Sequence, residues 1–113
     1  MNPTRFNVNE TTLYTDSNIK AGMTVELDSD GKAVIASSNS RFIGVCTKAN
    51  GNYISVALTG IVTVPYTGTT APNVGYELLS ADGNGKVKFN GASEVDHLVL
   101  SVNTKDKLVT FML

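Results

Sequence analysis

Apolar and polar side chains alternate along most of the chain after residue 21, a pattern typical of β-strands that bury one face. The alternation is regular over residues 23–28, and an Asp-Gly pair at residues 30–31 then turns the chain into a return strand. An Asn-Gly pair at residues 50–51 marks a further hairpin turn. Helical spacing of three and four does not extend beyond one turn anywhere, so little helix is expected.

The same order of elements occurs twice along the chain. Residues 21–58 and residues 74–113 each begin with a glycine-led strand, turn at an Asp-Gly pair, return, and end in a hairpin. An internal repeat defines the unit from which a fold is built. We therefore expect an all-β fold, a small compact barrel or sandwich in which two similar hairpin modules close around one core. Residues 21–113 would form this single domain.

The alternation also predicts the direction of each apolar side chain, because a slip of one residue would turn the whole row outward. The expected inward residues are Met23, Val25, Leu27, Ala33, Ile35, Ile43, Val45, Thr47, Ile54, Val56 and Leu58 in the first copy, and Tyr76, Leu78, Val87, Phe89, Leu98, Leu100, Val102, Val109, Phe111 and Leu113 in the second. The expected outward row contains Phe42, Val62, Val64, Tyr66, Leu79 and Met112.

Residues 1–20 differ from the rest, because they are rich in Asn and Thr and their apolar residues define no face. We expect an extended N-terminal arm, with two alternatives for its state. Either it is mobile alone and becomes ordered against a neighbouring subunit, or it folds back over its own barrel. In the first case Phe6, Val8, Leu13 and Tyr14 would fill pockets on the neighbour.

Charge and hydropathy narrow the expected partners. The 113 residues include nine basic and ten acidic side chains, a net charge of −1 at pH 7, and no basic run. A nucleic-acid partner is therefore not expected. No apolar stretch approaches the ~20 residues that span a bilayer, and the first residues lack the apolar segment of a signal peptide. Membrane contact and secretion are therefore not expected either.

Residues that could carry out chemistry are few. Cys46 is the only cysteine and His97 the only histidine, and for Cys46 we expect the role of a small buried apolar residue. Residues 28–31 begin like a calcium-binding loop, but Asn39 occupies the position that should supply a bidentate Glu. A turn explains both this segment and residues 82–85. We expect no catalytic residue, no metal and no cofactor.

Exposed rows of apolar side chains usually mark an interface with another protein. Phe42, Tyr66 and Met112 are the candidate contact residues from the outward row. The last strand, residues 110–113, has no polar tail and would need a partner or a cover. The expected protein is a subunit of a homo-oligomer or of a larger shell.

Several segments resemble a known family. They are Ala-Gly-Met-Thr-Val-Glu-Leu at residues 21–27, Asp-Gly-Lys at 30–32, Phe-Ile-Gly-Val at 42–45, Ile-Ser-Val-Ala-Leu-Thr-Gly-Ile-Val at 54–62, and Val-Gly-Tyr-Glu-Leu-Leu at 74–79. Over residues 21–90 the chain resembles the head decoration proteins of tailed phages, also called capsid cement or head auxiliary proteins. Some phage head-fibre proteins have a similar base domain.

The resemblance implies a non-enzymatic structural protein of the virion. Such proteins are small β-barrels, often trimers, that lie on the outer capsid surface and hold neighbouring major capsid subunits together. It also implies synthesis in the host cytoplasm and the major capsid protein as partner. A second hypothesis is a glycan- or host-surface-binding module of a head fibre or other virion appendage, with Tyr53, Tyr66 and loop Asn residues as contacts. A third hypothesis is a small enzyme, whose activity would depend on His97 or Cys46.

Overall fold

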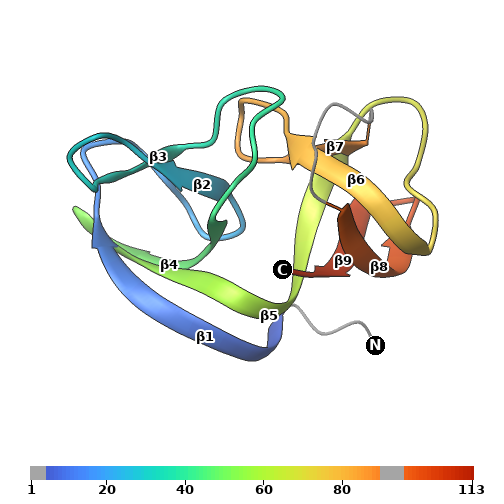
Figure 1. The fold of residues 1–113 in the computed structure, drawn as a ribbon, viewed down its shortest axis with the longest axis horizontal. Coiled ribbons are helices and arrows are strands. Elements are labelled where there is room, and N and C mark those ends of the chain that lie inside the picture. Colours follow the sequence, from blue (N-terminus) through green and yellow to red (C-terminus); the bar gives the residue numbers. More distant parts are fainter. Residues whose placement is uncertain (1–4, 90–95) are drawn as a thin grey trace.

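The computed structural model describes residues 5–89 and 96–113, the first four of these by their backbone alone (Figure 1). The described residues form no helix, and thus none that is long and apolar enough to cross a membrane. The strands are β1 (Arg5–Tyr14), β2 (Thr24–Leu27), β3 (Ala33–Ile35), β4 (Gly44–Asn50), β5 (Tyr53–Thr67), β6 (Gly75–Ala81), β7 (Val87–Phe89), β8 (Asp96–Asn103) and β9 (Leu108–Met112).

Five strands close into a barrel in the order β5–β7–β6–β8–β9, and β9 returns to β5. The β5–β7 pair is parallel and the other pairs of the barrel are antiparallel. The expected all-β fold with a small barrel is therefore confirmed. Closure leaves the barrel itself without an exposed edge strand, which protects it against unwanted strand addition.

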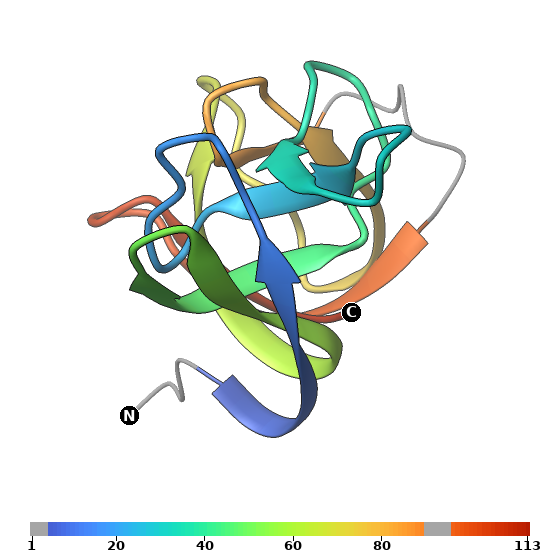
Figure 2. The same ribbon diagram turned by 90° about the vertical axis from the view of Figure 1, so that its left-hand side faces the viewer.

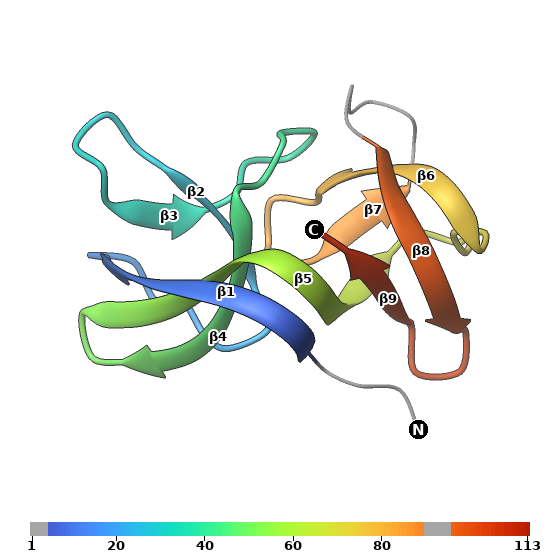
Figure 3. The same cartoon turned by 60° about the horizontal axis from the view of Figure 1, so that its bottom comes forward.

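The long strand β5 belongs to two layers at once. Its C-terminal half forms part of the barrel, while its N-terminal half lies between β4 and β1. Beyond β4 the sheet continues through β2 to β3. Figure 3 shows β5 running from the β1–β4 half of the molecule into the half that contains β6–β9.

The strand pairings repeat as the sequence predicts. In the first copy β2 pairs with β3 and with β4, and β4 pairs with β5; in the second, β6 pairs with β7 and with β8, and β8 pairs with β9. Val25 lies opposite Ile35 in the first copy, as Leu79 lies opposite Phe89 in the second. Both copies also contain a register shift in their last hairpin.

Buried apolar side chains form two clusters instead of the single core expected, and the larger cluster is shared by the two repeats. The main cluster combines barrel residues such as Phe111, Val99 and Val62 with Phe42 and Val45 of the first repeat. The second cluster lies under the first repeat and includes Val25 and Ile54. The expected inward residues that are buried are Val25, Ala33, Val45, Ile54, Val56, Val87, Val109 and Phe111.

Two sets of expected directions are reversed. The buried residues that were expected to point outward are Phe42, Val62, Val64, Tyr66 and Leu79. The exposed residues that were expected to point inward are Leu27, Ile43, Leu58, Tyr76 and Leu100.

Four of these reversals have a local cause. Val62, Val64 and Tyr66 keep the parity of Ile54 along β5, and the second half of that strand directs this parity into the barrel. Around Leu98, Val99 and Leu100, every position is apolar, so alternation does not identify the inward one. The register shift between Val99 and Ser101 leaves Leu100 outside.

The N-terminal segment is part of the fold over the residues described. β1 pairs antiparallel with β5 from Arg5 to Tyr14, which is the second of the two alternatives for the expected arm. Figure 2 views the molecule from the side of the first repeat, with β1 crossing in front. Leu13 packs against the second cluster, and buried Thr15 donates a hydrogen bond through its hydroxyl to the Ala33 carbonyl oxygen at 2.8 Å. These contacts hold the end of β1 against the first repeat.

Candidate functional site

A row of apolar side chains crosses the outer face of the barrel, one from each of four adjacent strands. Tyr76 lies opposite Leu98, Leu98 opposite Met112, and Met112 opposite Ile61. Tyr76 is 71% exposed and Met112 is 43% exposed. Directly opposed side chains on one face of a sheet lie close together, so these four form a continuous strip, which we call the apolar row.

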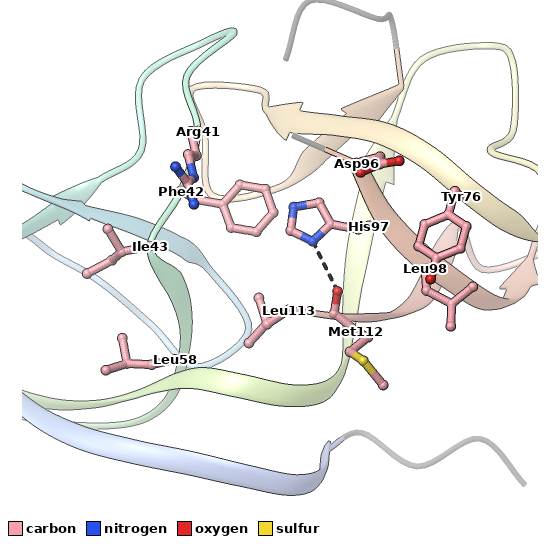
Figure 4. A pocket seen from close by; sticks show the side chains of 10 residues that line it. All are labelled: Arg41, Phe42, Ile43, Leu58, Tyr76, Asp96, His97, Leu98, Met112 and Leu113. Carbon is pink, nitrogen blue, oxygen red and sulfur yellow. Dashed lines mark hydrogen bonds between the residues drawn. The ribbon is translucent and has the colours of Figure 1, made fainter. Parts of the chain in front are cut away.

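Beside the apolar row is an open hollow of about 580 Å³ between the first repeat and the barrel (Figure 4). It is lined by Arg41, Phe42, Ile43, Leu58, Tyr76, Asp96, His97, Leu98, Met112 and Leu113. Leu58 is 39% exposed and Ile43 is 36% exposed, so they extend the apolar surface towards the first repeat. The hollow and the apolar row together form the docking face.

His97 forms the wall of the hollow where the two repeats meet. Its ring stacks on Phe42, with centroids 5.3 Å apart and planes 8° apart, and meets the ring of Phe111 edge-on at 5.3 Å. Nδ1 lies 3.0 Å from the Met112 carbonyl oxygen (Figure 4). Because a carbonyl only accepts, Nδ1 carries the proton of the neutral ring. Burial lowers the pKa of His97, an effect partly opposed by this hydrogen bond.

Opposite charges stand on the two sides of the hollow. Arg41 comes from the segment before β4, in the first repeat, and Asp96 from the start of β8, in the second. Figure 4 shows Arg41 on one side of the Phe42–His97 stack, with Asp96 and Tyr76 on the other. Both charged residues are exposed, and within residues 5–89 and 96–113 neither is seen in an ion pair.

A cysteine–histidine catalytic pair does not form. Cys46 is buried in the second cluster, whereas His97 contacts Phe42 and Phe111 of the main cluster. Burial raises the pKa of the Cys46 thiol, which keeps it protonated and a poor nucleophile near neutral pH. The part of the chain that the structure describes contains no group of three His, Cys, Asp or Glu residues placed to hold a metal ion.

The two Asp-Gly segments are hydrogen-bonded turns. Asp28 accepts backbone hydrogen bonds from Asp30 and Lys32 through Oδ1, each at 2.9 Å. Asp82 accepts the equivalent bonds from Asn84 at 2.7 Å and Lys86 at 2.9 Å. In each turn one Asp oxygen is therefore used to hold the loop, as expected for Asx-turn chemistry. The match between the turns is a further sign of the repeat.

A second exposed aromatic group lies at the end of β1. The rings of Tyr14 and Tyr53 meet edge-on with centroids 5.5 Å apart. The Lys32 ammonium lies 5.6 Å from the Tyr14 centroid and 2.9 Å from an Asp16 carboxylate oxygen. A side-chain hydrogen bond that the Tyr14 phenol donates to the Asp16 carboxylate is the main cause that raises the pKa of Tyr14. Tyr53 is 59% exposed, so its ring is open to contact.

The structure separates the seven candidate contact residues predicted from the sequence. Met112 lies in the apolar row, and Tyr14 is exposed at the end of β1. Leu13 is half-buried and packs against the second cluster. Phe42 and Tyr66 are each 5% exposed and belong to the main cluster, so the assignment of these two residues to an outward surface is wrong. Phe6 and Val8 lie in β1, but their side chains are outside the described part of the structure.

The sequence reading missed most of the docking face. Tyr76 and Leu98 were expected to point inward, and Ile61 was not considered. For Tyr76 the missing information is the alignment of the two repeats: placing Val25 with Leu79, and not with Leu78, turns Tyr76 outward.

Comparison of the chain with protein-family profiles, with curated proteins and with solved structures found no match.

Proposed function

We propose that this protein is a structural component of a phage virion that decorates the outer capsid surface and stabilises it by binding between major capsid subunits. The observation that carries the proposal is the docking face. The main cluster already buries the apolar interior of the barrel, yet Tyr76, Met112 and Leu58 stay exposed beside it. An apolar surface that the core does not use is best explained by contact with another protein.

The chemistry of the face favours a protein partner. Among the described residues that line it, Arg41 is the one lysine or arginine, which is too little positive charge to attract a phosphate backbone. Aromatic residues, Met and Arg are enriched at protein interfaces, and the face contains Tyr76, Met112 and Arg41. Contacts of modest strength are sufficient in a shell, because many copies bind one lattice at once.

The direct test is the addition of purified protein to phage heads assembled without it. We expect saturable binding at a fixed number of copies per capsomer. Met112→Asp places a charge in the apolar row and should weaken head binding by roughly tenfold or more. Leu27→Asp is the matched control, because Leu27 has a similar exposure, 46% against 43%, on another strand.

Absence of saturable binding by the folded wild-type protein would contradict the proposed function. Equal weakening by Met112→Asp and Leu27→Asp would contradict the role of the docking face.

A glycan-binding module remains the second candidate, favoured by the exposed Tyr53 ring beside Tyr14. Tyr66, its other expected contact, is buried and does not support it. Binding of the protein to a glycan array, together with no binding to heads, would favour this candidate over capsid decoration.

A further inference from the structure

We propose that the docking face binds the same face of a second copy of this chain across a two-fold axis. The inference names the partner at the surface described above, and it rests on the proposed function only in treating that surface as protein-binding. The capsid would then be bound through other exposed surfaces, such as the Tyr14–Tyr53 end of the first repeat. Met112→Asp would weaken head binding because a monomer attaches to the lattice at one point instead of two.

Charge complementarity is the first argument. In a two-fold interface the same patch is used by both partners, so a feature on one side of the axis meets the feature from the other side. Arg41 and Asp96 lie on opposite sides of the hollow (Figure 4). An axis between them therefore brings Arg41 of each copy towards Asp96 of the other, and the interface contains two such pairs. The same face pressed against an unrelated surface has no built-in reason to match both charges.

Shape is the second argument. Tyr76 is the most exposed large apolar side chain of the described residues, at 71%, and it stands on the same side of the hollow as Asp96 (Figure 4). The rotation that pairs the charges carries Tyr76 towards the Arg41–Ile43 side of the other copy. A guanidinium can stack on a tyrosine ring, and Ile43 offers an exposed apolar surface beside it. The face thus presents both a projection and a hollow that can receive it.

The charge of the whole chain permits this contact. A net charge of −1 produces little repulsion between identical copies. A small-molecule ligand fits the hollow less well, because such sites enclose their ligand and direct several polar groups into it. Here no buried side-chain nitrogen or oxygen among the described residues lacks a hydrogen-bond partner.

The test is a charge-exchange experiment on the full chain, without heads. The oligomeric mass is measured by light scattering after gel filtration and by analytical ultracentrifugation over a range of concentrations. The wild-type protein should approach twice the 12.0 kDa chain mass as the concentration rises. Arg41→Asp and Asp96→Arg each convert two attractive pairs into two repulsive pairs, so each should raise the dimer dissociation constant by roughly tenfold or more.

The double variant Arg41→Asp/Asp96→Arg restores opposite charges across the axis and should recover most of the dimerisation. Leu27→Asp is the control that should leave it unchanged. Thermal unfolding of each variant checks that the fold is retained. We expect that it is, because Arg41 and Asp96 are both exposed.

A monomer at every concentration, a trimer, or a double variant as weak as either single variant would overturn the two-fold assignment. None of these results bears on head decoration, which the binding experiment with assembled heads tests separately.

Discussion

His97 is one of the residues whose side chains connect the two repeats, and it is the residue at which pH should act. The ring is held between Phe42 and Phe111, and burial is the main cause that lowers its pKa from the usual 6.5. Arg41 also lowers this pKa, whereas Asp96 on the same strand opposes the shift. Glu77 lies opposite His97 in the register of β6 and β8.

The lowered pKa has a defined consequence for stability. Below about pH 6.5 the unfolded chain takes up a proton that the folded chain still excludes, so the free energy of unfolding should fall as the pH drops through this value. Above this pH, His97 is neutral in both states and the free energy of unfolding keeps its full value. Urea unfolding between pH 5 and pH 8 measures the effect, and nuclear magnetic resonance gives the pKa directly because His97 is the sole histidine.

His97→Phe provides the comparison, since it keeps an aromatic ring against Phe42 but has no proton to take up. Its stability should depend less on pH in this window than that of the wild-type protein. A folded-state pKa at or above 6.5, or equal pH dependence in both proteins, would refute the account of His97.

Gly44 is the second residue whose environment allows a sharp prediction. A Cβ at this position would collide with the backbone carbonyl oxygen of Ala57 and lie 2.8 Å from Cγ1 of Val56. Gly44→Ala should therefore lower the free energy of unfolding by about 1–3 kcal/mol, the usual cost of overpacking. Ala49→Ser, at an exposed position of the same strand, should change it by less than about 0.5 kcal/mol. Equal denaturation midpoints for the two variants would contradict the close approach of β4 and β5.

At the scale of elements, the pairing of β1 makes the N-terminal segment part of the fold instead of a free arm. The strand pairs with β5, and Leu13 packs against the second cluster. Deletion of residues 1–14 should therefore lower the unfolding midpoint and speed hydrogen exchange of the β5 amides near Ile54. Leu13→Ala should show a smaller effect of the same sign, about 1–2 kcal/mol, because the side chain is half-buried. Unchanged exchange and stability in the deleted protein would indicate that β1 is dispensable.

The sequence predicts the elements better than it predicts their faces. The turns at Asp28 and Asp82 and the order of strands in both copies follow from short-range signals, because Gly and Asp act locally. The register shifts near Cys46 and Val99 depend on long-range pairing, and alternation alone does not reveal them. That is why Leu100 was expected inside the fold.

At the scale of the whole molecule, alternation along the sequence likewise does not reveal which residues form the docking face. Met112 was recognised as an outward residue from the sequence, whereas Phe42 and Tyr66 were placed outside although they are buried in the main cluster. The apolar row forms only when four strands align, so its members are not neighbours in the chain. The long strand β5 also contributes residues to both buried clusters, a feature that a simple repeat does not predict.

The central claim, that this chain is a subunit of a capsid surface, is tested most directly by electron cryo-microscopy of heads assembled with and without it. The account predicts additional density on the outer surface at fixed lattice positions, into which the barrel and its β1–β4 extension fit, and heads that resist heat or chelation better when it is present. Identical reconstructions from the two preparations, with the folded protein left in solution, would contradict it.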